Sequence, residues 1–328
     1  MATTPCSRSH RPRNEPRAIG YRHGLPRIVS LLPSTTEIVC ALGLRESLVG
    51  RSHECDFPSG VGALPVLTSA KLDASRDSAA IDRDVRSLVE QGLSIYRVDA
   101  ERLRQLAPDV ILTQDHCAVC AASLADVERA LADWLGTKPA IVSVAPSTLG
   151  DVWADLQQIA RATGVPERGK TLAAELAEAL TEWAEQAQAQ PARPSVACIE
   201  WIDPLMSAGN WMPELVHLAG GRPLLGEVGQ HSPLLAWETL VSADPDVLLV
   251  VPCGFGLSRT RDELAPLVAQ PGFRELRAVR EGRAYLADGN AYFNRPGPRL
   301  VESLAILCTL LHPGAFGARA AATGWAPL

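Results

Sequence analysis

The sequence predicts an α/β protein of two lobes, each with a mostly parallel sheet covered by helices, joined by a long rigid helix. Two observations support this prediction: a pattern that occurs twice, and a helical stretch between the copies. Residues 101–112 and 238–249 each contain a Glu, a Leu two residues later and a Pro-Asp-Val seven residues later. The matched spacing indicates two lobes of similar build.

Each copy of the pattern predicts a helix, a turn and a buried strand. The proline disfavours helix at the residue before it, so the amphipathic run ends there. The run after it is rich in Val, Ile and Leu. Such a continuous apolar run is typical of a strand in a parallel sheet that is covered on both faces.

Length and composition exclude several classes of protein. A chain of 328 residues can hold two domains with sizeable cores, and 47% hydrophobic with 21% charged residues is ordinary for a globular protein. The net charge of −6, without a basic patch, argues against a nucleic-acid partner. No apolar run approaches the roughly 18 residues of a membrane-spanning helix.

The N-terminal segment bears on the location of the protein. Residues 1–25 are predicted to be a disordered basic tail, and they lack the apolar core of a secretory signal. As the sequence stands we expect a cytoplasmic protein, with a periplasmic or cell-surface location only if another route secretes it. Eight cysteines in such a chain do not indicate a disulfide framework.

The N-terminal lobe is predicted to span residues 26–149. Its first strand, 27–32, stops at Pro33, and Ser34 or Thr35 is expected to cap the helix that follows. Turns at strand carboxyl ends line the ligand crevice of open α/β sheets, and backbone N–H groups at a helix start suit an anionic or carbonyl group. These three residues are therefore candidate ligand contacts; the alternative is a plain helix cap. Further elements are expected at 48–51, 81–92, 110–114, 123–135 and 140–144.

The connecting segment is predicted to span residues 150–193 and to be almost entirely helical. Its second part places apolar residues four, four and three positions apart, at Leu172, Leu176, Leu180 and Trp183. This single apolar stripe, without a Gly/Ser linker, predicts a strut that limits hinge motion. The C-terminal lobe follows at 194–312, opening with a strand at 195–201, and residues 313–328 are expected to form a tail.

Several segments together resemble the ABC-importer substrate-binding proteins that carry cobalamin, haem and ferric siderophores. The resemblance covers roughly residues 27–312 and rests on 28–37, on both Pro-Asp-Val repeats and on 294–299. It implies a ligand cleft between the lobes. It also implies that one exposed Glu on each lobe pairs with arginines of the permease, and those positions match Glu101 and Glu238. The alternative is that each Glu only favours the positive end of its helix.

Within that family the chain looks most like the cobalamin-binding branch. The segments 52–58 and 113–120 resemble those of cobalamin-binding proteins, although the secreted vitamin B12 binders lack the Cys-x-x-Cys found here. The resemblance implies a monomer that binds a corrinoid, either for an ABC permease or as an intracellular binder, with no required cofactor. Haem or a ferric siderophore is the alternative ligand.

A corrinoid is a flat, mostly apolar disc fringed with amides, so aromatic side chains and a few polar anchors suit it. His231 lies on a predicted loop and suits cobalt ligation; a solvated loop histidine is the alternative. For the aromatic candidates the alternative is a place in the lobe core. The remaining candidate ligand contacts are His53, Gln114, Trp201, Trp211, Tyr292, Phe293 and Asn294.

A metal site is a further hypothesis. His53 and Cys55 on one loop, with Cys117 and Cys120 on another, have residue types that suit zinc or iron. A metallocluster-binding protein of this architecture is the rival hypothesis. A redox pair or buried inert thiols are the alternatives. The motifs of hydrolases, P-loop NTPases and dinucleotide-binding enzymes are absent, so we expect no enzyme.

Overall fold

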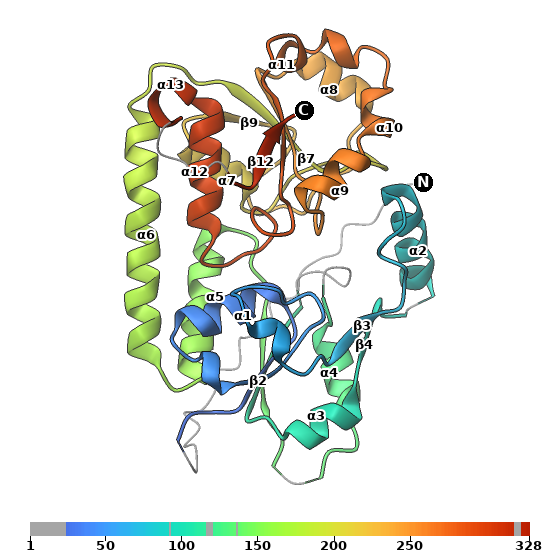
Figure 1. Ribbon diagram of the computed structural model, residues 1–328, viewed down its shortest axis with the longest axis vertical. Coiled ribbons are helices and arrows are strands. Elements are labelled where there is room, and N and C mark those ends of the chain that lie inside the picture. The colour runs from blue at the N-terminus through green and yellow to red at the C-terminus, as the bar shows by residue number, and fades with distance from the viewer. Residues whose placement is uncertain (1–23, 92, 116–120, 136, 318–322) are drawn as a thin grey trace.

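The computed structural model describes residues 24–91, 93–115, 121–135, 137–317 and 323–328. It shows two lobes, one above the other in Figure 1, with the helix α6 running along one side of both. The predicted two-lobe α/β architecture is confirmed. The predicted basic tail, 1–25, lies outside the described residues except for its last two positions.

The N-terminal lobe is built on a parallel four-stranded sheet in the order β2-β1-β5-β6. Its strands are β1 (Ile28–Ser30), β2 (Leu48–Arg51), β5 (Val110–Gln114) and β6 (Ala140–Val144). Its helices are α1 (Pro33–Ala41), α3 (Ala100–Leu106) and α4 (Leu124–Ala130), and α5 (Leu149–Ala162), the first helix of the connection to the other lobe, packs against its core. Separate apolar clusters pack on the two faces, as expected for a parallel sheet covered on both sides.

A second, smaller unit projects from the N-terminal lobe. Strands β3 (Thr68–Ala70) and β4 (Tyr96–Val98) pair antiparallel, and the chain between them forms α2 (Ser78–Glu90). In Figure 1, α2 lies on the side of the molecule opposite α6 and below α9 of the other lobe. Neither strand was predicted, because three-residue strands give too little periodicity to detect.

The C-terminal lobe has a larger, mixed sheet in the order β12-β11-β10-β7-β8, with β9 also paired to β7. Strands β9, β7, β10 and β11 pair parallel with one another, whereas β8 pairs antiparallel with β7 and β12 antiparallel with β11. The strands are β7 (Ser195–Trp201), β8 (Met206–Ser207), β9 (Arg222–Leu224), β10 (Val247–Val250), β11 (Ala284–Ala287) and β12 (Trp325–Pro327). The helices are α7 (Met212–Leu218), α8 (Trp237–Ala243), α9 (Leu257–Asp262), α10 (Ala265–Val268), α11 (Arg277–Arg280), α12 (Leu300–Leu311) and α13 (Pro313–Phe316).

The described residues 313–317 and 323–328 are part of the C-terminal lobe, which differs from the tail predicted for 313–328. Phe316 on α13 is 1% exposed and joins the lobe core. Strand β12 adds an edge to the sheet by pairing with β11. Burial of an aromatic ring holds the first of these stretches and backbone pairing the second, and both depend on partners far away in the sequence.

The repeated pattern forms the same structure twice. Helices α3 and α8 end in residues with left-handed backbones, Ala107 (φ 40°) and Asp244 (φ 35°), before β5 and β10 begin. The Asp of each Pro-Asp-Val accepts a backbone N–H at the start of the neighbouring strand, Asp109 from Arg27 and Asp246 from Ser195, both at 2.8 Å. The repeat therefore sets the register of the central strand pair in each lobe.

The connection between the lobes consists of α5 and α6 (Pro166–Gln188). At 1.5 Å per residue, α6 is about 35 Å long. Its predicted apolar stripe is shared: Leu172 and Leu176 pack against the N-terminal core, and Leu180 and Trp183 against the C-terminal core. A single helix embedded in both cores makes the connection rigid.

Candidate ligand cleft

Loops from the two sheets meet where their strands end. Asp56 lies in the loop after β2 of the N-terminal lobe, and Arg295 lies in the segment after β11 of the C-terminal lobe. The guanidinium of Arg295 donates to both carboxylate oxygens of Asp56, at 2.6 and 3.1 Å. The carboxyl ends of the strands therefore face each other across the lobe boundary, which is where open α/β sheets bind ligands.

Five side chains form the contact that we call the inner junction: Glu37, Asp56, Asn290, Arg295 and Arg299. Glu37, on α1, is 3% exposed and accepts from Arg295 at 3.1 Å and from Arg299 at 2.9 and 2.5 Å. Asn290 accepts from Arg295 at 3.0 Å and donates to Asp56 at 3.1 Å. Two arginines of one lobe thus enclose a buried carboxylate of the other.

The opposite charges of the inner junction stabilise the ionised forms of their partners. Partial desolvation disfavours ionisation of Asp56, whose side chain is half exposed, but the hydrogen bonds and charge of Arg295 outweigh it and hold the pKa of Asp56 below its usual value. Burial likewise opposes the charge of Arg295, and Asp56 and Glu37 hold its pKa above the usual value. Paired in this way, charged groups can remain in a poorly solvated place.

The sequence did carry a signal for this junction. Glu37 is a charged residue in an otherwise apolar and hydroxyl-bearing helix, and Arg295 and Arg299 stand in a run of prolines and glycine. A lone charge in a buried helix requires a partner. The pairing itself could not be read, because Glu37 and Arg295 are 258 residues apart.

Two of the three ligand contacts predicted at the start of α1 are buried inside the lobe. The helix begins at Pro33 after Leu32, so neither Ser34 nor Thr35 caps it. Thr35 is fully buried and its hydroxyl lies 2.7 Å from that of Ser30. Ser34 is 3% exposed and Pro33 half-buried. Pro33 therefore offers the most surface of the three.

The loop after β2 presents His53 and Glu54. His53 is exposed, its Nδ1 lies 2.8 Å from the hydroxyl of Thr68, and partial desolvation of the ring lowers its pKa. Glu54 accepts from the phenol of Tyr96 at 3.1 Å, and burial raises the pKa of its carboxyl to about 7. A neutral imidazole and a partly protonated carboxyl can both donate to the carbonyl oxygens of a ligand amide.

The aromatic candidates have different surroundings. Trp201, at the end of β7, is half-buried, packs against Phe255 at 5.2 Å between ring centroids, and donates to the carbonyl of Asp203. Tyr292 is also half-buried and lies beneath the guanidinium of Arg299 at 5.5 Å. These two rings keep exposed surface at strand ends of the C-terminal lobe.

Trp211 and Phe293 belong to the core instead. Trp211 is 6% exposed and donates from its indole to the carbonyl oxygen of Phe293 at 2.7 Å, and Phe293 is fully buried. The expectation that Trp211 packs on a ligand ring is therefore not met by its position. Its ring anchors the segment that carries Asn294 and Arg295.

The other predicted contacts lie on strand ends and loops. Gln114 ends β5 and is 6% exposed. Asn294 is half-buried and donates to the carbonyls of Val251 and Gly289, which fixes the loop. His231 is exposed, with Nδ1 3.1 Å from the carbonyl of Ser232.

The metal hypothesis receives no support from the described residues. Cys55 is 1% exposed, accepts from Thr36 at 3.0 Å, and burial raises the pKa of its thiol to about 11, so it remains a neutral thiol. Within the described part of the chain, no three His, Cys, Asp or Glu side chains gather to hold a metal ion. Cys117 and Cys120 lie outside the described residues.

Residues 28–291 match the family model described as periplasmic binding protein. The chain belongs to this family. The membership confirms the resemblance seen in the sequence and makes this a binding protein rather than an enzyme.

The family membership also shows that the expectation of a cytoplasmic location is wrong, because the family is periplasmic and one relative, YvrC of Bacillus subtilis, is an ABC transporter substrate-binding lipoprotein. Of the helices in the described ranges, none has the length and apolar character needed to cross a membrane.

Relatives and solved structures agree with this assignment to the periplasmic binding proteins. The vitamin B12-binding protein of Pectobacterium carotovorum is 22% identical, over 90% of this chain and 94% of its own. YvrC is 24% identical, over 88% and 81%. The periplasmic haem-binding protein RhuT of Roseiflexus superposes with a TM-score of 0.66 at 24% identity, over 89% and 100%. The vitamin B12-binding protein BtuF of Vibrio cholerae superposes with a TM-score of 0.61 at 20% identity, over 88% and 96%.

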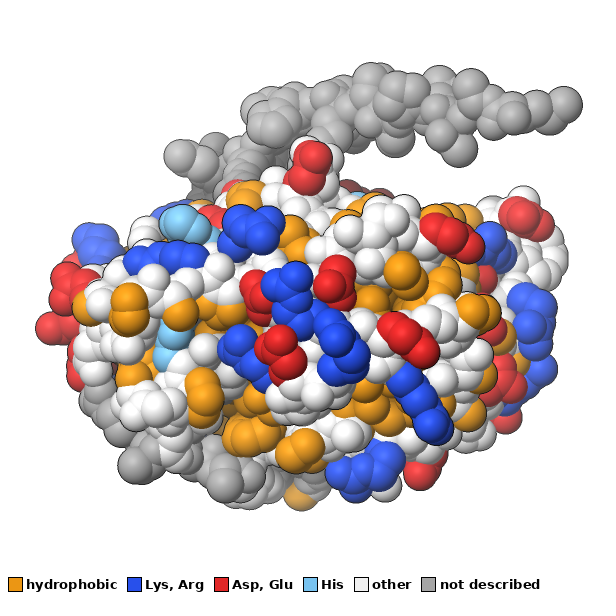
Figure 2. Space-filling model, turned by 90° about the horizontal axis from the view of Figure 1, so that it is seen from above, with side chains coloured by type: hydrophobic (Ala, Val, Ile, Leu, Met, Phe, Trp, Pro, Cys, Tyr) orange, Lys and Arg blue, Asp and Glu red, His pale blue; other side chains and the backbone are white. Residues whose placement is uncertain are grey.

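The two predicted docking residues of this periplasmic binding protein occupy equivalent places. Glu101 and Glu238 are both exposed and both lie in the first turn of a seven-residue helix, α3 and α8. Seen from above, the C-terminal lobe shows acidic and basic side chains interspersed among apolar ones (Figure 2).

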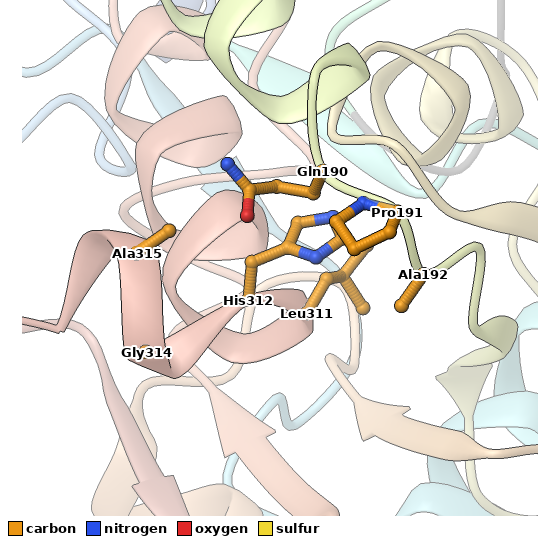
Figure 3. A pocket seen from close by; sticks show the side chains of 7 residues that line it. All are labelled: Gln190, Pro191, Ala192, Leu311, His312, Gly314 and Ala315. Carbon is orange, nitrogen blue, oxygen red and sulfur yellow. The ribbon is translucent and has the colours of Figure 1, made fainter.

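One surface hollow lies away from the lobe boundary. It measures about 360 Å³ and lies between the end of α6 and the end of α12, with His312 at its centre (Figure 3). His312 is 7% exposed and its Nε2 lies 3.0 Å from the carbonyl of Ala219. The imidazole therefore ties α12 to the end of α7.

Proposed function

We propose that this chain binds a cobalamin-like corrinoid in the cleft between its lobes and delivers it to an ABC permease. The observation that carries the proposal is the arrangement of the strand ends. Half-buried rings, Trp201 and Tyr292, stand on one lobe, and hydrogen-bonding groups, His53 and Glu54, stand on the other. A flat disc needs apolar surface for its faces and polar groups for its rim.

Two further observations support a corrinoid. Curated vitamin B12-binding proteins from Pectobacterium, Photorhabdus and Vibrio align over most of the chain at 22% identity. The rim of a corrinoid is fringed with neutral amides, and a neutral His53 beside a partly protonated Glu54 suits amides better than the carboxylates of haem. Haem is the second candidate because haem-binding proteins share the fold, and His231 is exposed and suits axial ligation of iron.

Docking to a permease is proposed for Glu101 and Glu238. Each carboxylate is exposed on a helix that the repeat places in the same way in its lobe. Uptake of labelled cobalamin by cells that carry Glu101→Lys and Glu238→Lys tests this role. Normal uptake by the double variant would contradict it.

The ligand is tested by titrating the purified protein with cyanocobalamin, dicyanocobinamide and haem in separate experiments. We expect one cyanocobalamin per chain, seen by calorimetry and by quenching of tryptophan fluorescence. Trp201→Ala should weaken binding by about 1–3 kcal/mol, the value of burying a large apolar side chain.

Trp237→Ala is the matched control. Trp237 is also half-buried and also donates to a backbone carbonyl, that of Pro271, but it lies on α8 away from the strand ends. Its removal should leave affinity unchanged. If the protein binds haem but neither cyanocobalamin nor cobinamide, the proposed ligand is wrong and haem takes its place.

A further inference from the structure

The lobes also touch at a second place, on the side of the molecule opposite α6. There the N-terminal end of α2 and the residue two positions before it meet α9 and Glu263 (Figure 1). We call this contact, formed by Arg76, Ser78, Arg259 and Glu263, the mouth bridge. It spans the lobe boundary at the far side from the rigid connection.

Glu263 completes the start of α2. The first N–H groups of a helix have no partner within the helix. The backbone N–H of Ser78 donates to the carboxylate of Glu263 at 3.1 Å, across 185 residues of sequence. Ser78 is only 1% exposed as a result of this contact and its surroundings. A carboxylate from the C-terminal lobe therefore acts as a cap for a helix of the N-terminal lobe.

Arg259 connects the mouth bridge to Trp201, one of the two rings in the proposed ligand site. Its guanidinium donates to the carbonyl oxygen of Arg76 at 2.9 Å and lies 3.6 Å above the ring of Phe255. Phe255 in turn packs against Trp201. Phe255 is thus the single ring between the mouth bridge and Trp201, the tryptophan that the proposed function places against the ligand.

Of the elements at the lobe boundary, α2 is weakly held. Among its 13 residues, all of them described, two are buried, Ser78 and Ala80. The helix is attached to the rest of the lobe through the antiparallel pair β3 and β4 and through two partly buried side chains, Val85 and Leu88, that pack against the N-terminal core. Segments with few buried contacts open at low free energy, whereas α6 is embedded in both cores.

We propose that the mouth bridge is a gate for the ligand, in which α2 moves away from α9 to admit it. Arg259 is a positioning residue that couples the closed gate to the Phe255–Trp201 pair. The part of this proposal that concerns the ligand rests on the proposed function. The existence of the gate does not, so the two are tested separately.

The gate is tested first without ligand, by hydrogen exchange of the full-length protein. Glu263→Ala should raise the exchange rate of a peptide covering residues 76–82 by about tenfold, the factor for one hydrogen bond to a charged group. Asp262→Ala removes the same charge from the neighbouring exposed residue and should change nothing. Equal exchange in wild type and Glu263→Ala would overturn the gate.

The role in ligand passage is tested by stopped-flow fluorescence with cyanocobalamin. Glu263→Ala should raise association and dissociation rates together, by about tenfold each, and leave the affinity within about twofold. Arg259→Ala should raise both rates and also shift the fluorescence of Trp201, because Phe255 lies between the two side chains. Arg261→Ala changes an exposed arginine nearby and should do neither.

The outcomes separate the two proposals. If wild type binds no cyanocobalamin, the proposed ligand fails, and hydrogen exchange still decides the gate. If wild type binds it and the variants show unchanged rates, the role of the bridge in passage is wrong. Slower association in Glu263→Ala would also overturn it, because an open gate cannot impede entry.

Discussion

The two places where the lobes meet differ in the kind of bond that joins them. The inner junction pairs charged side chains with charged side chains, with the neutral Asn290 bridging two of them, and its central members, Glu37 and Arg295, are 3% and 6% exposed. The mouth bridge pairs side chains with backbone groups, the N–H of Ser78 and the carbonyl of Arg76, at the edge of a weakly held helix. The first contact is costly to break and the second is not.

This difference has a physical basis. Removing one partner of a buried ion pair leaves an uncompensated charge in a poorly solvated place and costs about 3–5 kcal/mol. A side chain–backbone hydrogen bond near the surface is exchanged for bonds to water and contributes roughly 0.5–1.5 kcal/mol. The inner junction is therefore suited to holding the lobes together, and the mouth bridge to opening.

The largest effect is expected at Glu37. Glu37→Gln removes the charge that Arg295 and Arg299 share, and the free energy of unfolding should fall by about 3–5 kcal/mol. Urea denaturation followed by circular dichroism measures the loss. Glu101→Gln, which changes an exposed Glu, should stay within about 0.5 kcal/mol. A loss that small in Glu37→Gln would remove the distinction between the two contacts.

A pH-dependent effect is expected at Glu54, next to the inner junction. Burial raises the pKa of its carboxyl to about 7 in the folded protein, against an ordinary value of 4.5. The folded state therefore holds this proton more tightly than the unfolded state. The associated stability is fully present below pH 4.5 and is lost as the pH rises through 7, by about 3 kcal/mol in total.

Glu54→Gln tests this assignment. The amide still accepts from Tyr96 but does not titrate, so the decline in stability between pH 4.5 and 7.5 should be reduced by that amount. Urea midpoints over this pH range are the measurement. An unchanged pH profile would show that another group is responsible.

The fold was predictable because its evidence is local. Strands β6 and β7 have the predicted bounds, 140–144 and 195–201, since continuous β-branched and apolar runs define them. The repeat led to α3–β5 and α8–β10 because proline and the residues around it act over a few positions. Strand β12 was missed because it exists only through pairing with β11.

The site was predictable only as a location. Strand ends were expected to form the cleft, and the cross-lobe contacts do lie there. The orientation of single side chains was not predictable: Trp211 stands in a loop-like segment, yet its indole binds the carbonyl of Phe293 in the core. The mouth bridge uses the backbone of Arg76 and Ser78, and a backbone acceptor or donor leaves no trace in the residue types.

The smallest effect on stability is expected at Glu263, and it is the sharpest test of the comparison. Glu263→Ala exchanges one hydrogen bond to Ser78 for water, so the free energy of unfolding should fall by about 1–1.5 kcal/mol. The same urea denaturation measures it beside Glu37→Gln. Because α6 and the inner junction still hold the lobes together, the protein should still unfold in a single urea transition. A loss equal to that of Glu37→Gln would make the mouth bridge a structural contact rather than a gate, since a gate that opened at that cost would open too rarely to pass a ligand.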